Sequence, residues 1–472
     1  PRLVILDQFE NLLDPQTGHA LSANAGVGEL LDALNSQPCA SRVLLTSRHI
    51  PHGTLDNAPA ALRIYHVIDL SITEGVELLR GLGVAGNEAM LHEAANRCNG
   101  HALSLTLLGT LTLLKENAVS LATLLKDADY TQLWEGRIEE KLLEKIFSSL
   151  PAPSRGLLCA FSIYRQAVPV DAALAVLTNT TKERALVTLG GLLEQHLLQA
   201  PPARGLYQPH PIVAVYARRH FFLDVSAGGE TARKAAHAQA AQYYAQMIAA
   251  SNATPGKIKV IGEARPLIET VWQLCQAEQF QEAYELMHRE DLFGKLKLWG
   301  ANTALLELCQ LLLSGNWAYT PQQKAFLASY IAGTANVLGR KQEALGYYEQ
   351  ALQIYRDVKN RKAEGTMLNN LGLVYNALGQ KQEALGYFEQ ALRIMREMGD
   401  RGGEGTTLNS LGGLYNALGQ RQEALGYYEQ ALHIRREVGD REGEGVTLNN
   451  LGLVYNALGQ RQEALGYYEQ AL

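Results

Sequence analysis

Cysteine is scarce in this 472-residue sequence, and its five copies are scattered along the chain. No two of them form a C-x-x-C pair, which excludes a disulfide-rich scaffold and a cysteine-based zinc module and favours a cytoplasmic location. An excess of one charge sign is also lacking, since 42 Lys and Arg nearly balance 48 Asp and Glu and leave a net charge of −6. The sequence therefore has no chain-wide basic field of the kind that predicts nucleic-acid binding. Long apolar runs are missing too: the segment from His101 to Leu114 is interrupted by hydroxyl residues and predicts a buried helix, not a membrane span.

What the sequence does contain is enough apolar surface for several folded domains. Hydrophobic residues make up 47% of the chain, which excludes a wholly disordered protein, and the length predicts roughly three domains. The chain starts at Pro1, without a signal-peptide pattern, and stops at Leu472 inside a helical pattern. We therefore expect it to be cut at both ends and to be the middle and sensor portion of a longer protein.

Glycine is concentrated in the last third of the chain, where 21 of the 43 copies fall in residues 322–472. The cause is a repeat of 40 residues. The segment Arg401–Leu432 matches Arg441–Leu472 at 27 of 32 positions and differs only at positions 402, 406, 410, 413 and 414. A fixed period of this size predicts a solenoid.

Each repeat predicts two helices. In one repeat, Leu368, Leu371, Gly372 and Tyr375 share a face of the first helix, Gly379 ends it, and Ala384, Phe388 and Ala391 mark the second helix. This pattern resembles the tetratricopeptide repeat, in the 40-residue form of the kinesin light chain group. The resemblance covers about 150 residues. It implies a protein or peptide partner on the concave surface. Glycines also lie inside the second helices at 346, 386, 426 and 466, where we expect close neighbour packing.

Asparagine recurs on the opposite face of the first helices, beside Thr366 and Leu373 and their equivalents. The predicted peptide-binding residues are Asn369, Asn376, Asn409, Asn416, Asn449 and Asn456. Asparagine is a poor helix former, and its amide both donates and accepts hydrogen bonds, which suits gripping an extended backbone. The alternative is that duplication merely copied one asparagine pair.

The head of the chain predicts part of an α/β sheet. The apolar strand Leu3–Leu6 ends at Asp7, which could hold the Mg²⁺ of a nucleotide, and Glu10 follows one turn later, where it could orient a water. A second apolar strand begins at Arg42 and ends at Arg48, a cation at the edge where a terminal phosphate would lie. A capping box at Ser71–Glu74 then predicts the start of a helix.

The order of these landmarks resembles the NB-ARC type of STAND signalling ATPases over about residues 1–225. The resemblance implies that Asp7 is the Walker B acid and metal ligand, Glu10 catalytic, and Arg48 the γ-phosphate sensor. It further implies that Gly100 and Leu103 contact adenine and that His210 contacts the β-phosphate of ADP.

The sequence departs from that family in ways that weaken an enzymatic role. Ala102 stands where the family's adenine motif has proline, and Pro211 stands where the family has an acid after the histidine, here His210. Gln8 stands where the family often has a second Walker B acid. No G-x-x-x-x-G-K-[S/T] phosphate loop is present. The family hydrolyses ATP slowly. We expect this segment alone to bind no ADP, ATP or Mg²⁺ and to be inactive, and the cofactor to belong to the full-length protein.

The predicted fold is mostly α: a partial α/β P-loop NTPase core, a helical domain, a winged helix and an α-solenoid. The predicted bounds are 1–70, 71–135, 136–225, a helical linker at 226–320, and repeats at 321–472. The predicted function is an ADP/ATP-gated switch with a tetratricopeptide sensor, able to self-oligomerise with nucleotide and making no membrane contact. The alternatives are a non-enzymatic peptide-binding scaffold and a winged-helix transcription regulator. The last is disfavoured because no Arg/Lys cluster marks a recognition helix.

Overall fold

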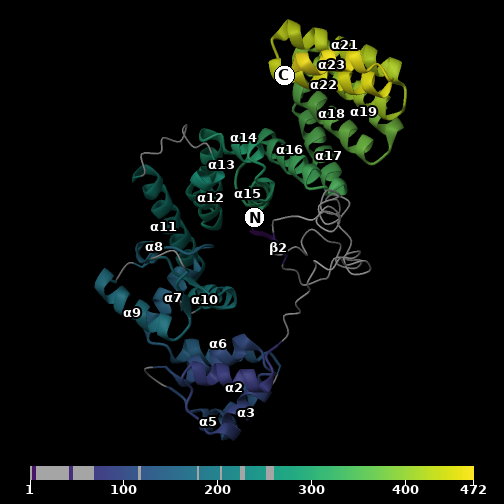
Figure 1. Ribbon diagram of the computed structural model, residues 1–472. Helices are drawn as coiled ribbons and strands as arrows, with labels where there is room; N and C mark the ends of the chain where they lie inside the picture. Colours follow the sequence, from purple (N-terminus) through teal and green to yellow (C-terminus); the bar gives the residue numbers. More distant parts are fainter. Residues whose placement is uncertain are drawn as a thin grey trace. The chain divides into compact units, whose positions relative to one another are not determined.

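The computed structural model describes residues 3–6, 42–45, 69–114, 118–134, 136–177, 180–201, 205–223, 229–250 and 260–471, which are mostly helical (Figure 1). Contacts divide the chain into two units, residues 64–286 and residues 1–63 with 287–472, and each is described by itself. Within these described ranges, no helix is both long enough and apolar enough to span a bilayer.

The two predicted strands at the head are confirmed and pair with each other. Strand β1 (Leu3–Leu6) runs parallel to β2 (Arg42–Leu45), with Leu3 opposite Arg42 and Leu6 opposite Leu45. A parallel pair requires a crossover connection, as in α/β sheets. The predicted residues Asp7, Glu10 and Arg48 lie outside the described residues.

The unit of residues 64–286 begins with a group of short helices. The predicted capping box is present, because Ser71 Oγ accepts from the Glu74 amide at 3.3 Å and Glu74 Oε2 accepts from the Ser71 amide at 2.8 Å. The segment predicted as a buried helix is α4, in which Ser104 and Thr110 are fully buried. The elements are α2 (Ile72–Gly81), α3 (Glu88–Arg97), α4 (Ala102–Thr112), α5 (Leu121–Lys126), the 3₁₀ helix η3 (Ala128–Trp134) and α6 (Ile138–Ser149).

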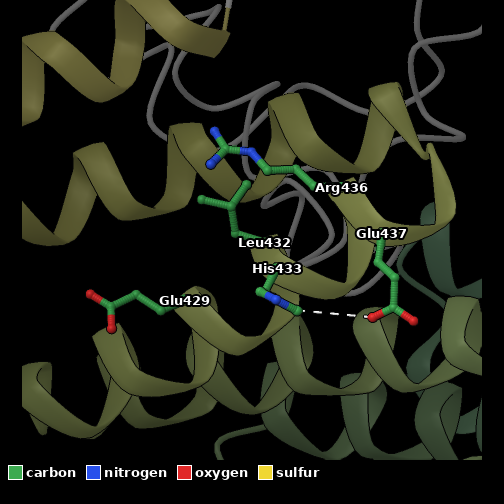
Figure 2. Close-up of a pocket in the computed structure, with 5 residues that line it drawn as sticks. All are labelled: Glu429, Leu432, His433, Arg436 and Glu437. Carbon is green, nitrogen blue, oxygen red and sulfur yellow. Dashed lines mark ion pairs between the residues drawn. The ribbon is translucent and has the colours of Figure 1, made fainter.

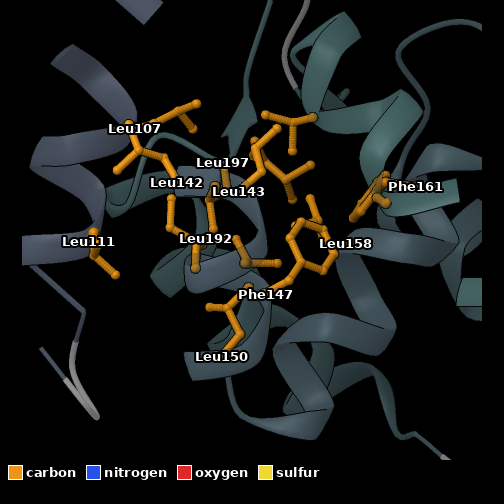
Figure 3. Packing of buried hydrophobic residues seen from close by; sticks show 14 of the residues in the cluster. Leu107, Leu111, Leu142, Leu143, Phe147, Leu150, Leu158, Phe161, Leu192 and Leu197 are labelled. Atoms are coloured by element: carbon orange, nitrogen blue, oxygen red, sulfur yellow. The ribbon is translucent and has the colours of Figure 1, made fainter. Parts of the chain in front are cut away.

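Four helices and a small antiparallel strand pair follow, packed on one apolar core. The elements are α7 (Ala152–Ser162), α8 (Val170–Val176), α9 (Lys182–Glu194), β3 (Leu198–Gln199), β4 (Gln208–Pro209) and α10 (Pro211–Leu223). Strands β3 and β4 are antiparallel, and Val168 forms a bridge to Tyr207 beside them. The core contains Leu142, Phe147, Leu158 and Phe161, which meet between α6 and α7 (Figure 3).

A buried polar cluster connects the end of α7 to α11 (Gly229–Ala250) and α12 (Ile261–Gln276). Arg165 Nη2 pairs with Glu269 Oε1 at 2.8 Å, and its guanidinium lies 4.6 Å from the centre of the Trp272 ring. Gln273 joins two of these groups. Its Oε1 lies 2.6 Å from His237 Nδ1, and its Nε2 donates to the Ile163 carbonyl at 3.1 Å. Burial lowers the pKa of His237 to about 4, so its imidazole is neutral.

The last part of the chain is a series of helical hairpins with a period of 40 residues, drawn from green to yellow in Figure 1. Three further helices precede it: α13 (Phe280–Arg289), α14 (Leu292–Leu298) and α15 (Asn302–Ser314). The hairpin helices are α16 (Pro321–Val337), α17 (Lys341–Asp357), α18 (Arg361–Ala377), α19 (Lys381–Glu397), α20 (Arg401–Ala417), α21 (Arg421–Val438), α22 (Arg441–Ala457) and α23 (Arg461–Ala471). Even-numbered helices are the first, and odd-numbered the second, of each hairpin.

Two kinds of glycine differ sharply in their surroundings. A Cβ built on Gly412 in α20 would lie 2.7 Å from Cδ1 and Cε1 of Tyr428, so only glycine permits this approach of α20 to α21. The glycines inside the second helices, such as Gly426, have no atom within 4 Å of a built Cβ. The expected close packing of those second-helix glycines is therefore wrong, and the structure offers no packing reason for them.

Candidate functional site

The six predicted asparagines all lie on the first helices of the hairpins, but their environments differ. Asn449 and Asn456 on α22 are exposed, and Asn376 and Asn416 are half-buried. Asn369 on α18 is only 5% exposed, because the neighbouring hairpin covers it. A wheel drawn for one isolated helix does not include that neighbour.

Asn409 joins one hairpin to the next. Its Oδ1 accepts from Asn450 Nδ2 at 3.1 Å and lies 3.2 Å from Thr447 Oγ1, and both partners belong to α22. The side chain is therefore committed to the contact between α20 and α22, a structural role that its position on the wheel did not predict.

Asn369 occupies the equivalent place between α18 and α20 but has no such partner. Its Oδ1 is buried without a hydrogen bond. The residue equivalent to Asn450 is Ser410, which donates its hydroxyl to the Thr406 carbonyl at 3.1 Å. The residue equivalent to Thr447 is Thr407, which donates to the Gly403 carbonyl at 2.9 Å.

One stripe of the first helices carries most of the differences between the last two repeats, Arg401–Leu432 and Arg441–Leu472. Four of the five positions that distinguish Arg401–Leu432 from Arg441–Leu472 recur every third or fourth residue and share a helix face. We call this set the variable stripe: Lys362, Thr366, Asn370 and Leu373 in α18, Gly402, Thr406, Ser410 and Gly413 in α20, and Glu442, Val446, Asn450 and Leu453 in α22. Three of its residues are exposed apolar side chains, namely Leu373, Val446 and Leu453 at 40%, 49% and 50% exposure.

The scaffold beneath the variable stripe repeats faithfully. Each of the last three hairpins stacks two tyrosine rings, with centroids 5.1 Å apart for Tyr375 and Tyr387, 5.0 Å for Tyr415 and Tyr427, and 5.2 Å for Tyr455 and Tyr467. In each copy one ring comes from the first helix and one from the second, so the pair fixes how the two helices lie against each other.

A ladder of ion pairs also repeats with the hairpins. Glu404 is 6% exposed, and its carboxylate receives Arg396 Nε at 2.8 Å from the preceding hairpin and Arg401 Nη1 at 2.5 Å from its own helix. Arg401 also reaches Glu437 at 2.6 Å, which lowers the pKa of that carboxyl. The same arrangement recurs at Arg356, Glu364, Arg361 and Glu397. The predicted local ion pairs at these loops are therefore present, and they extend between hairpins.

Residues 324–397 and 403–472 match the family model described as tetratricopeptide repeat. The C-terminal region is a tetratricopeptide repeat array. No curated protein sequence matches the chain significantly.

Solved structures similar to the chain include several with tetratricopeptide repeats. A STAND protein with a tetratricopeptide repeat sensor from Pyrococcus horikoshii is 16% identical, with a TM-score of 0.37, and the match covers 99% of this chain and 67% of that one. BtubC (BKLC) from P. vanneervenii is 21% identical, with a TM-score of 0.32, and the match covers 51% of this chain and 89% of that one. A protein described as a kinesin light chain with nearly identical TPR-like repeats, from Podospora anserina, is 25% identical, with a TM-score of 0.30 and coverage of 44% and 92%.

The predicted nucleotide residues within the described ranges make contacts with the protein itself. Gly100 has a φ of +70°, and a Cβ there would lie 1.9 Å from the Leu70 carbonyl oxygen, so the chain path requires glycine at this position. Leu103 packs against the apolar core. His210 is half-buried, which lowers its pKa, and its Nδ1 accepts from the Ile212 amide at 3.4 Å.

The outer face of the repeat array has a shallow depression on α21, lined by Glu429, Leu432, His433, Arg436 and Glu437 (Figure 2). Arg436 donates to Glu444 at 2.7 Å, and His433 lies 4.0 Å from Glu437. Two of the lining charges are held in ion pairs with residues outside the depression, Arg436 with Glu444 and Glu437 with Arg401. No group of His, Cys, Asp or Glu suited to a metal ion occurs within the described residues.

Sequence reasoning missed Ser410 and Gly413 as functional candidates. The signal was available, because both are among the five positions at which two nearly identical repeats differ. The predicted site rests on residues that the repeats share, so it does not include positions at which they differ.

Proposed function

We propose that the tetratricopeptide array is a sensor that binds an uncharged, extended segment of a partner protein along the variable stripe. One observation carries the proposal: Arg401–Leu432 and Arg441–Leu472 are nearly identical, and four of their five differences lie on this stripe. No position differs between Arg421–Leu432 in α21 and Arg461–Leu472. Neutral drift would also have changed the exposed positions of those second helices.

The chemistry of the variable stripe suits a peptide. Beyond its first position, the stripe carries hydroxyl, amide and apolar side chains and no charge. Amides and hydroxyls satisfy the N–H and C=O groups of an extended chain, while exposed leucine and valine offer contacts to apolar side chains. Phosphate-rich nucleic acid, in contrast, requires arginine and lysine.

The test compares two exposed leucines of the same repeat. Leu453→Asp places a charge on the stripe, whereas Leu465→Asp places one on α23, where Leu465 is 57% exposed. We expect peptides selected from a random display library on the full chain to lose about ten-fold or more of their affinity with Leu453→Asp only. Equal effects of the two variants, or no selected peptide, would exclude the stripe as the binding surface.

We further propose that the array regulates an ADP/ATP-dependent switch at the head of the chain. The parallel pairing of β1 and β2, and the order of helices, hairpin and His210 that follows, support this proposal. In the switch, bound ADP keeps a closed monomer, and partner binding favours an open, oligomerising state.

The switch requires a phosphate loop, so it is tested in a form of the chain that carries such a loop ahead of Pro1. We expect it to retain ADP on purification, to change its assembly with ATP, and to lose both properties with Asp7→Ala. A simple scaffold would signal equally well with Asp7→Ala. A transcription regulator would instead bind DNA in a salt-dependent manner.

A further inference from the structure

The contact between α18 and α20 differs from the next contact in the array in one hydrogen-bonding group. Between α20 and α22, Asn450 Nδ2 donates to Asn409 Oδ1 at 3.1 Å. Asn450 is half-buried, so its amide reaches Asn409 from the surface that carries the variable stripe. That donor is what the α18–α20 contact lacks.

Between α18 and α20, Asn369 Oδ1 is left as a buried acceptor without a donor. The equivalent of Asn450 is Ser410, whose shorter side chain turns to the Thr406 carbonyl at 3.1 Å. A buried amide oxygen without a partner is destabilising in the isolated protein. An asparagine amide supplies the donor in one contact, whereas a donor from outside can supply it in the other only after the side chains that cover Asn369 Oδ1 turn aside.

Gly413 lies one turn beyond Ser410 and interrupts the row of leucines on the stripe. Leucine occupies the equivalent positions 373 and 453. A Cβ on Gly413 would meet only Tyr428 Oη, at an ordinary 3.5 Å, and its φ is not positive. Neither packing nor backbone geometry requires glycine there, although glycine inside a helix is unfavourable. The missing side chain leaves room above α20 between the two flanking leucines.

We propose that this place, formed by Asn369, Ser410 and Gly413, anchors the partner peptide. The peptide donates a backbone N–H to Asn369 Oδ1 and seats one large apolar side chain over Gly413. Neighbouring helices pack about 8–10 Å apart, so Leu373 and Leu453 are separated by about 20 Å, which about six extended residues span. The anchoring residue is therefore near the middle of a short, uncharged segment. This inference rests on the proposed function and adds the position and chemistry of the anchor.

The experiment uses peptides selected on the full chain from a random 12-residue display library and then synthesised. Ser410→Asn supplies the internal donor for Asn369, and Gly413→Leu fills the open space. Both introduce residues that the next repeat already carries, so both variants should fold. Gly426→Leu is the matched control, because Gly426 is also a helix glycine with open space around it but lies off the stripe.

We expect Ser410→Asn and Gly413→Leu each to weaken peptide binding by about ten-fold or more, and Gly426→Leu to leave it unchanged. The selected peptides should share one large apolar residue, and changing it to alanine should cause a similar loss. Peptides that bind the stripe but are insensitive to both variants, or that require a charged residue, would overturn this inference alone. If no peptide is selected, the proposed function fails with it.

Discussion

Replacing Gly412 by alanine tests whether first and second helices are held at glycine contact distance. The added Cβ would lie 2.7 Å from two ring carbons of Tyr428, and Tyr428 is only 3% exposed. Overpacking of this kind costs about 1–3 kcal/mol, and the ring has little room to move, so the upper part of that range applies. The better helix propensity of alanine returns about 1 kcal/mol. We therefore expect a net destabilisation of about 1–2 kcal/mol.

Gly426→Ala is the same chemical change in the same hairpin, but no atom lies within 4 Å of the new methyl group. Only the propensity gain remains, so we expect a stabilisation of about 0.5–1 kcal/mol. The two variants should therefore differ by about 2–3 kcal/mol in opposite directions, although composition and charge change identically.

Hydrogen exchange in the full chain measures both effects locally. Peptides from α20 differ in sequence from those of α22, so the affected hairpin can be followed separately. Protection in α20 should fall about five- to thirty-fold with Gly412→Ala and rise with Gly426→Ala. A shift in the same direction for both variants would show that helix propensity, and not the contact with Tyr428, controls these positions.

Three other predictions follow from contacts described above. Glu404→Gln should lower the stability of α20, measured by hydrogen exchange, by about 1–2 kcal/mol, because it removes the charge between Arg396 and Arg401. The control Glu442→Gln, at an exposed position, should have little effect. Asn409→Ala should cost about 1 kcal/mol more than Asn369→Ala in urea titrations, since only Asn409 Oδ1 has donors; equal costs would contradict the assignment. Burial, with Arg233 and Arg218 nearby, lowers the pKa of His237 to about 4. As the pH falls from about 6.5 towards 4, the unfolded chain therefore binds a proton at this histidine before the folded chain does. The free energy of unfolding should fall over this range by up to about 1.4 kcal/mol per pH unit. Urea titrations at several pH values should show a shallower dependence for His237→Gln.

The repeat architecture could be predicted from the sequence because every signal agreed. Gly379 and Gly419, predicted to end first helices, have φ values of +80° and +78°. Leu368, Leu371 and Gly372, predicted to share a buried face, are buried in α18. Periodicity, stop signals and small residues at the helix contact all act within one repeat, so a local pattern is enough to reveal them.

The environment of each asparagine could not be predicted in this way. Asn369 and Asn409 have the same place in the period, yet one lacks a partner and the other has two. The difference is set by residue 410 or 450 in the following repeat, about 40 positions away in the chain. A helical wheel contains only one helix, whereas the hydrogen bonds of these amides depend on two.

The ion ladder recurs from one repeat to the next, which gives successive repeats the same charge pairing at their junctions. Arg396 meets Glu404 in the way that Arg436 meets Glu444, so each second helix meets the following first helix through the same ion pair. Inserting or deleting one whole 40-residue unit would therefore join two surfaces that already match. The reach of the array can change by recombination without any new interface having to evolve, and the identity of each repeat depends on a few side chains of the variable stripe.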